Sequence, residues 1–207
     1  NGAGKSTFLR VLSGIYKPDK GCAYIDDEPI YENPKVKENI VFVSDELFFL
    51  PGATMSKMAD FYSSIYDRFN YDRFLKLAEL FELNIKKPIA NFSKGMKRQA
   101  SIILALSTRA KYMFFDETFD GLDPVMRNLV KKLICNDVAE YDTTVIVTSH
   151  SLRELEDICD HLALLHKGGL VLDSDVLELK TTQFKVQIAF KGIFGKTKFE
   201  GLNITRY

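Results

Sequence analysis

The opening segment of the chain, NGAGKST, combines two glycines, a lysine and two hydroxyl residues directly before a predicted helix. Glycines let a backbone approach phosphate oxygens closely, and the amide groups at a helix N-terminus form a cradle for anions. Lys5 is placed to reach β- and γ-phosphates, and the hydroxyl of Ser6 is placed to coordinate Mg²⁺. The alternative is a Gly-rich turn without a ligand. We predict a phosphate-binding loop made of Asn1, Gly2, Ala3, Gly4, Lys5, Ser6 and Thr7.

The second feature is a predicted buried strand that ends in two acids. The sequence YMFFDE places Asp116 and Glu117 after an apolar run, where a carboxylate is costly to bury unless it has a partner. Asp116 suits Mg²⁺ bound through water, and Glu117 suits the general base that polarises an attacking water. A solvated strand end is the alternative, but it would not explain why the two acids occur together with the phosphate-binding loop.

Two further polar segments complete the set. In NFSKGMKRQ, Ser93 and Gly95 lie at a predicted helix N-terminus and form a second phosphate receptor, although an ordinary N-cap explains the same residues. The segment DGLD ends in Asp123, and His150 follows a predicted buried strand, where it is placed to reach a γ-phosphate or to be a structural histidine. We expect a solvated helix face, with phosphate contact as the alternative, for Lys94, Lys97 and Arg98.

Short strands and helices that alternate along the chain must position these residues. Apolar strands are predicted at 39–44, 112–115 and 144–149. This alternation favours an α/β domain with a mainly parallel sheet. Helical periodicity dominates residues 47–111, which we expect to form a helical subdomain inserted into that core. Helices are predicted at 6–14, 54–83, 93–111, 124–139 and 151–159, and hairpins at turns 26–27 and 168–169.

Composition narrows the possible classes of protein. The 207 residues carry 28 basic and 28 acidic side chains, and this zero net charge argues against binding nucleic acid through bulk charge. No apolar run approaches the roughly 20 residues that span a membrane, and no signal peptide is visible. Three cysteines without a CxxC pair argue against a disulfide scaffold or a zinc site, and favour a reducing cytoplasm. We expect Cys22, Cys135 and Cys159 to be packing residues, and His161 and His166 to have no role.

Both ends of the chain look interrupted. A complete phosphate loop of this type begins with a glycine three residues upstream of Gly2, and it follows a strand. At the other end, apolar residues alternate over 184–190 as in a strand, and the pattern then stops. We therefore expect a fragment that begins inside its first motif and continues into a C-terminal extension.

In this order, the motifs resemble the nucleotide-binding subunit of ATP-binding cassette (ABC) transporters. NGAGKST stands where that family has its Walker A motif, FFDE its Walker B motif, FSKGM its LSGGQ signature, DGLD its D-loop and His150 its switch histidine. The resemblance covers about residues 1–172, implies a P-loop NTPase fold, and leaves 173–207 as the start of an extension. It has departures: Lys94 and Met96 replace a glycine and a glutamine of the signature, and Asp45, or one step on Glu46, replaces the Q-loop glutamine.

The resemblance implies an ATPase that uses ATP and Mg²⁺ as a head-to-tail dimer of like or unlike subunits. Each ATP then lies between the Lys5 loop of one chain and the Ser93 segment of its partner, which explains the second phosphate receptor. The resemblance assigns catalysis to Glu117 and His150. It assigns metal binding to Ser6, Asp116 and Asp45, and nucleotide contacts to residues 1–7, Ser93, Gly95 and Asp123.

At the level of the cell, the resemblance implies a subunit on the cytoplasmic face of a bacterial-type membrane that powers membrane-spanning permease subunits. The pattern S-x-G-M-K is similar to that of bacterial ABC ATPases that serve export. The alternative function is a non-transport ABC ATPase that acts on ribosomes or nucleic acid. In this family the helical subdomain docks on the membrane subunits. Candidates for that docking, which we favour instead as fillers of the helical core, are Phe48, Phe49, Tyr62, Tyr66 and Phe69.

Overall fold

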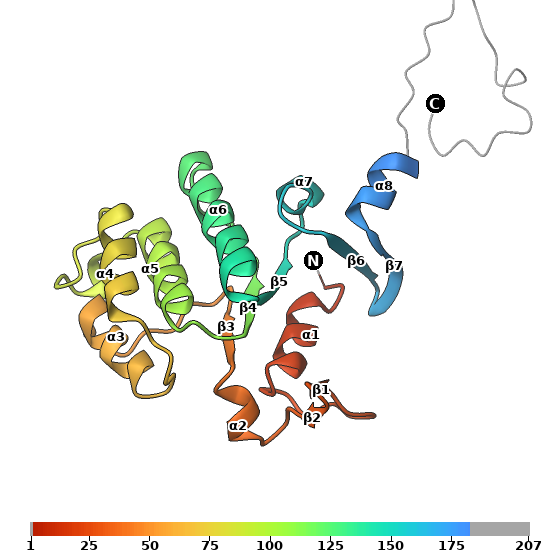
Figure 1. The fold of residues 1–207 in the computed structure, drawn as a ribbon, viewed down its shortest axis with the longest axis horizontal. Coiled ribbons are helices and arrows are strands. Elements are labelled where there is room, and N and C mark those ends of the chain that lie inside the picture. The colour runs from red at the N-terminus through yellow and green to blue at the C-terminus, as the bar shows by residue number, and fades with distance from the viewer. Residues whose placement is uncertain (1, 183–207) are drawn as a thin grey trace, which may run out of the picture.

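A three-stranded parallel sheet forms the centre of the computed structural model, which describes residues 2–182 (Figure 1). Its strands are β3 (Ile40–Val43), β4 (Tyr112–Asp116) and β5 (Thr144–Thr148), side by side in the order β3-β4-β5. The three predicted buried strands are therefore confirmed as neighbours. Because the strands are parallel, their carboxyl ends meet at one edge of the sheet, where Asp116 is paired in register with Thr148.

Helices and two small hairpins surround this sheet. The hairpins are formed by β1 (Tyr24–Ile25) with β2 (Glu28–Pro29) and by β6 (His161–His166) with β7 (Gly169–Asp175). Within residues 2–182 the α-helices are α1 (Lys5–Leu12), α2 (Pro34–Lys37), α3 (Met55–Ser63), α4 (Tyr71–Leu80), α5 (Lys94–Ser107), α6 (Pro124–Tyr141), α7 (Leu152–Leu155) and α8 (Val176–Thr182), and a short 3₁₀ helix, η1, spans Ile89–Asn91. Helices α2 and α8 were not predicted from the sequence, and α7 is shorter than the predicted helix 151–159. The alternating segment 184–190 and Asn1 lie outside the described residues.

Alternating side chains bury the sheet on both faces. Val41 and Met113 belong to the larger hydrophobic cluster, which also holds buried residues of α5 and α6. Their neighbours Ile40 and Phe114 belong to a second cluster, together with Leu9 of α1. Figure 1 shows the same division, with α5 and α6 on one side of the sheet and α1 on the other. The fold is thus α/β with a parallel sheet, as predicted, and helices cover both faces of that sheet.

The region between β3 and β4 is helical, but it contains more helices than predicted. Instead of one helix over 54–83, α3 and α4 are separated by a turn at 64–70. Asn70 starts α4 because its side chain accepts a hydrogen bond from the Arg73 amide at 2.8 Å. The apolar residues Tyr66 and Phe69 lie within the turn, so helical spacing alone hid the break. The limits 47 and 111 of a helical subdomain stay a prediction.

Some of the side chains that we expected to pack in the core are buried, and others are exposed. Phe48 is 73% exposed, while the other four aromatic candidates, as we favoured, pack against the larger cluster: Phe49, Tyr62, Tyr66 and Phe69. The prediction for the cysteines is wrong at two positions, since Cys22 and Cys135 are exposed. Cys159 is partly buried, and this burial raises the pKa of its thiol.

Two arginines join the helical region to α6. Arg73 of α4 forms an ion pair with Asp137 of α6, whose side chain is 2% exposed. Burial raises the pKa of Asp137, and the charge of Arg73 acts in the opposite direction. Arg109 lies over the ring of Tyr141 with its guanidinium carbon 3.8 Å from the ring centroid. Helical region and α6 are therefore held together by charge as well as by apolar packing.

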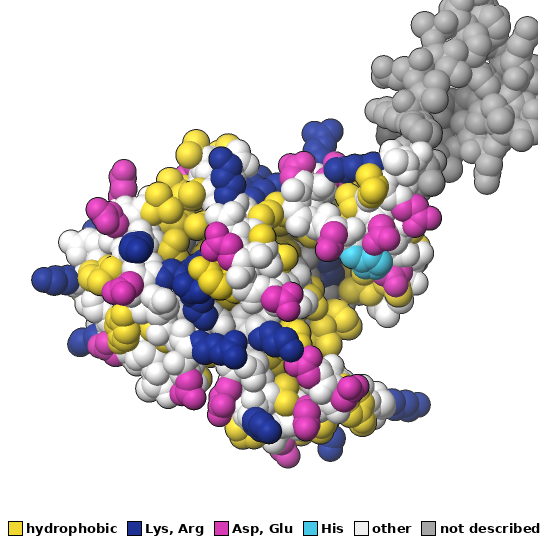
Figure 2. Space-filling view, viewed as in Figure 1, with side chains coloured by type: hydrophobic (Ala, Val, Ile, Leu, Met, Phe, Trp, Pro, Cys, Tyr) yellow, Lys and Arg dark blue, Asp and Glu magenta, His cyan; other side chains and the backbone are white. Residues whose placement is uncertain are grey.

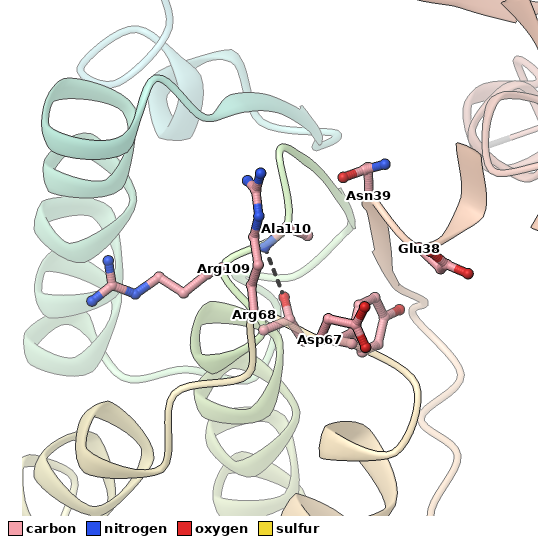
Figure 3. Close-up of a pocket in the computed structure, with 8 residues that line it drawn as sticks. Glu38, Asn39, Asp67, Arg68, Arg109 and Ala110 are labelled. Carbon is pink, nitrogen blue, oxygen red and sulfur yellow. Dashed lines mark hydrogen bonds between the residues drawn. The ribbon is translucent and has the colours of Figure 1, made fainter. Parts of the chain in front are cut away.

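A small pocket of about 110 Å³ lies beside this junction, lined partly by Arg68, Arg109 and Ala110. Figure 3 shows Arg109 pointing out of the pocket toward α6, while the Ala110 amide donates a hydrogen bond to the Thr108 hydroxyl at 3.2 Å. The residues that precede β3 and β4 line this pocket. It is therefore at the opposite end of the strands from Asp116.

Charged side chains of both signs are interspersed over the face of the molecule seen in Figure 2. Several Lys and Arg side chains gather near the centre of that view. Within residues 2–182, every helix is too short or too polar to cross a membrane.

Candidate functional site

The predicted phosphate-binding loop leads directly into α1. Gly4 precedes this helix with a positive φ of 98°, a conformation that other residues rarely adopt, and a Cβ added to it would meet no atom within 4 Å. The Phe8 amide donates to the Gly4 carbonyl at 2.8 Å, so the amides before Phe8 lie at the open end of the helix. Together with the positive end of the helix dipole, these amides form an anion-binding end.

Asp116, the last residue of β4, has one carboxylate oxygen that accepts a hydrogen bond and one that has no hydrogen-bond partner among the described residues. The Thr148 hydroxyl donates to Asp116 Oδ1 at 2.6 Å. Asp116 Oδ2 is buried and has no hydrogen-bond partner within residues 2–182. A buried carboxylate oxygen normally has a donor, a water or a cation beside it. The orphaned oxygen therefore fits the predicted role of Asp116 in holding Mg²⁺, together with Ser6 of α1.

Glu117 joins three of the predicted motifs. Its Oε1 lies 3.4 Å from the Lys5 ammonium, and its Oε2 accepts a hydrogen bond from the His150 amide at 3.1 Å. The His150 ring nitrogen Nδ1 is also 3.1 Å from the same Oε2. The Glu117 amide donates to the Thr148 carbonyl at 3.1 Å, which fixes the backbone beside β5. The carboxylate is therefore held between a cation and an imidazole.

The DGLD segment contributes a further acid besides Asp123. Asp123 caps α6, because its Oδ1 accepts hydrogen bonds from the amides of Val125 and Met126 at 2.9 and 3.0 Å. Asp120 instead lies near the site, with Oδ2 3.9 Å from His150 Nδ1. Ligand atoms of Glu117, Asp120 and His150 all lie within 4.8 Å of one another. Asp120 was not predicted as a site residue, and its place at the start of the DGLD motif is the one sequence signal that points to it.

The Ser93 segment is built as a helix start but is not joined to the Lys5 loop. The Ser93 hydroxyl accepts a hydrogen bond from the Met96 amide at 3.2 Å. A Cβ added to Gly95 would lie 3.1 Å from the Gly121 carbonyl oxygen, so this segment closely approaches the DGLD turn. Within residues 2–182, no hydrogen bond or ion pair links Ser93 or Gly95 to the Lys5 loop.

The prediction that Arg98 is solvated is wrong. Its side chain is 2% exposed and forms an ion pair with Asp45, with Nη2 2.7 Å from Oδ1. Lys94 is exposed, as expected. Asp45 is thus engaged by an arginine, whereas Glu46, the other residue considered for the Q-loop position, is exposed. Arg98 is buried because the loop after β3 covers it, and the spacing of residues along α5 gives no sign of that contact.

A second polar cluster lies on the β6–β7 hairpin, away from the motifs. His161 Nε2 is 2.6 Å from Asp173 Oδ1, and His161 Nδ1 is 3.1 Å from Asp175 Oδ1. Hydrogen bonds from the His161 ring to the carboxylates of Asp175 and Asp173 raise the pKa of His161 above its usual value. His161 was expected to have no role, but here it links the two strands of the hairpin. A further link joins this hairpin to the phosphate-binding loop, where the Gly168 amide donates to the Ala3 carbonyl at 3.3 Å.

Comparisons with known proteins agree with this arrangement. Residues 1–120 match the model of a protein family described as ABC transporter. The ABC transporter ATP-binding protein YtrB of Bacillus subtilis is 34% identical over 190 residues, which cover 92% of this chain and 65% of that protein. The linearmycin resistance ATP-binding protein LnrL of the same organism is 31% identical over 177 residues, which cover 83% and 57%. The chain therefore spans less than two thirds of the length of either relative.

A solved structure has the same fold. It is an ATP-binding cassette described as a dimer in a post-hydrolysis state bound to ADP and Pi. The TM-score is 0.74, the matched region covers 84% of this chain and 81% of that chain, and the sequence identity is 20%. This likeness confirms the predicted fold class, an α/β core of the P-loop cassette type.

Proposed function

The chain belongs to the ABC transporter family, and from this premise we propose that it is an ATP-binding and ATP-hydrolysing subunit that powers a membrane transporter. The observation that carries the proposal is the position of Glu117, held between Lys5 and His150 beside the open end of α1. This places a carboxylate, a phosphate-binding cation and an imidazole at one end of the sheet, which is the set that phosphoryl chemistry needs.

The phosphate end of ATP is assigned to the loop before α1. The glycine-rich backbone offers amide groups to the β- and γ-phosphates, and Lys5 adds a positive charge. Ser6 and Asp116 are proposed to hold Mg²⁺, which when bound would neutralise charge on the phosphates. The orphaned Oδ2 of Asp116 supports this assignment. The role of Asp45 as a third metal ligand stays a prediction from the sequence, and in this structure its Oδ1 accepts a hydrogen bond from Arg98 Nη2.

Glu117 is proposed to take the proton from the water that attacks the γ-phosphate. His150 holds the carboxylate at Oε2 through its amide and its ring, which fixes the orientation of the base. Lys5 is bonded to the other carboxylate oxygen at 3.4 Å. A γ-phosphate bound by the loop would compete for Lys5 and so leave Glu117 Oε1 available to the water. Positioning and charge, rather than covalent chemistry, would supply the rate.

We propose that two subunits, like or unlike, enclose each ATP. The support is the Ser93 segment: it is a helix start that, among residues 2–182, makes no hydrogen bond or ion pair to the Lys5 loop, as a receptor for the partner's nucleotide requires. The related cassette solved with ADP and Pi is dimeric. Ser93, Gly95 and Asp123 are thus proposed to contact the nucleotide across the interface.

The remaining partners are proposed to be membrane-spanning permease subunits, which would place the protein peripherally on the cytoplasmic face of a bacterial-type membrane. YtrB is named as the ATP-binding protein of an ABC transporter, and LnrL is named as an ATP-binding protein of linearmycin resistance. This name supports export as the direction of transport. Phe48, 73% exposed in the loop between β3 and α3, is a candidate contact for the permease.

The test uses the full-length protein with Glu117→Gln, which keeps the shape of the side chain and removes its charge. The variant is expected to bind ATP, to lose hydrolysis by about 10²–10⁴-fold, and to elute as a dimer with ATP but not with ADP. Glu79→Gln, an exposed change on α4, is the matched control and should hydrolyse ATP normally. A monomer under saturating ATP would refute the dimer.

The proposed partner is tested by purification of the tagged full-length protein from detergent-solubilised membranes. A multi-spanning membrane chain that co-purifies supports the transporter. Ribosomes or nucleic acid in its place would keep the ATPase chemistry and refute the transport function.

A further inference from the structure

Arg98 is the largest fully buried side chain of the described residues, and its contacts go to one short stretch of chain. Its Nη1 donates to the Ser44 carbonyl at 3.0 Å. Its Nη2 donates to the Asp45 carbonyl at 3.1 Å and to Asp45 Oδ1 at 2.7 Å. A buried guanidinium is stable only where such acceptors surround it. The backbone just after β3 is therefore shaped around one arginine.

The position of Arg98 connects this stretch to the Ser93 segment. Arg98 lies on α5 five residues after Ser93, which corresponds to roughly 7 Å along a helix. The chain from Ser44 onward leads from β3 to α3, so it is the connection by which the sheet enters the helical region. One side chain thus joins that connection to the first two turns of the helix that carries Ser93.

The charges of the pair are complementary but unequally buried. Arg98 is 2% exposed and Asp45 is 57% exposed. The pair of Lys111 and Asp26 provides a comparison, because its N···O distance is also 2.7 Å and Asp26 is also 57% exposed, yet Lys111 is 43% exposed. Water can replace Asp26 as the partner of Lys111, but it has little access to Arg98. Asp45 is therefore the nearest compensating charge for a buried cation.

We propose that Arg98 is a positioning residue and Asp45 its anchor, so that the connection after β3 and the Ser93 end of α5 move as one body. Asp45 is then a structural partner of Arg98 and not a ligand of Mg²⁺. We call the Arg98–Asp45 pair the clamp. Its consequence at the ATP site rests on the proposed function: the clamp would set where Ser93 meets the nucleotide of the partner subunit.

The clamp itself is tested by hydrogen–deuterium exchange of the full-length protein without nucleotide. Asp45→Ala is expected to speed amide exchange over residues 44–50 about tenfold, while exchange in β4 stays unchanged. Asp45→Asn, which keeps an acceptor oxygen, should lie between Asp45→Ala and wild type. Asp26→Ala is the matched control and should leave residues 44–50 unchanged. Exchange over 44–50 that is the same in Asp45→Ala and wild type would overturn the proposal.

The consequence is tested in the Glu117→Gln background by separating ATP binding from dimer formation. Asp45→Ala should leave the affinity of the monomer for a fluorescent ATP analogue within about twofold, and weaken ATP-driven dimerisation about tenfold. Arg98→Lys, which keeps the charge and loses the fork, should have the same effect. An unchanged dimer, or an ATP affinity that falls as much as dimerisation does, would overturn the positioning role.

The rival role of Asp45 is tested in the same protein by titrating Mg²⁺ against nucleotide binding. The concentration that gives half-maximal binding should be the same for Asp45→Ala and its parent. A shift of about tenfold would make Asp45 a metal ligand and overturn the proposal. If the Glu117→Gln parent forms no dimer with ATP, the proposed function fails, and the exchange measurement still decides whether the clamp exists.

Discussion

Replacing Arg73 with methionine is expected to lower the free energy of unfolding by about 3 kcal/mol at pH 8. Methionine keeps much of the apolar stem and removes the charge, which leaves Asp137, 2% exposed, without its ion-pair partner. Breaking a buried pair costs about 3–5 kcal/mol, and the lower end applies because Arg73 is itself 14% exposed and Arg109 also acts on Asp137. For a chain of 150–250 residues, such a loss lowers Tm by roughly 6–12 °C.

The pH dependence follows from the pKa of Asp137, which burial raises above its usual value. The folded protein therefore holds this proton more firmly than the unfolded chain does. Stability from this group is present at low pH and is lost as pH rises through the folded pKa. Without Arg73 the pKa rises further, because the charge that opposed burial is gone. The difference in Tm between Arg73→Met and wild type should consequently be larger at pH 8 than at pH 5.

The assay is thermal unfolding of the full-length protein followed by circular dichroism at both pH values. Lys111→Met breaks the exposed pair with Asp26 and is the matched control, with a fall in Tm of no more than about a third of that in Arg73→Met. Adding Asp137→Asn to Arg73→Met should recover part of the loss, since the unpaired carboxylate is then removed. A fall in Tm no larger than that of the control, or one larger at pH 5 than at pH 8, would refute the reasoning.

Two further predictions concern hydrogen bonds of the described residues. Because Asp175 and Asp173 raise the pKa of His161, the hairpin gains stability below the usual value of 6.5 and loses it as pH rises through the folded pKa. An NMR titration should show a raised pKa for His161 in the wild type and a lower one in Asp173→Asn, and equal values in the two proteins would contradict this prediction. Thr148→Val removes the hydroxyl that donates to buried Asp116 and should lower the free energy of unfolding, measured in urea, by about 1–3 kcal/mol. Thr148→Ser keeps a hydroxyl and should lower it far less, and equal losses in the two variants would contradict the role of the hydroxyl.

Much of the site could be predicted because its residues follow short apolar strands. Asp116 and His150 end or follow runs that can only be buried strands, and parallel strands bring their carboxyl ends to one edge. The meeting of Glu117 with Lys5 and His150 follows from that topology. The motifs and the short apolar strands before them were therefore sufficient to predict that these residues lie together.

Other features depend on contacts that no local pattern reports. Arg98 lies in a run of charged letters, and only the loop packed over α5 decides that it is buried while Lys94 is not. The position of Asp120 near His150 depends on the backbone of the turn at Gly121, whose φ is 78°. The break between α3 and α4 was hidden for the same reason, since apolar residues continue through it. These are tertiary effects that override helical spacing.

Glu117 adopts a positive φ of 48°. For residues other than glycine, asparagine and aspartate this left-handed conformation is rare, at a cost of roughly 1–2 kcal/mol. Glycine or asparagine at position 117 would relax the backbone and at the same time remove the carboxylate that the proposed hydrolysis requires. A variant library sorted only for heat resistance would therefore accumulate hydrolytically dead proteins at this position, so thermostabilisation of this chain requires a turnover screen alongside the thermal one.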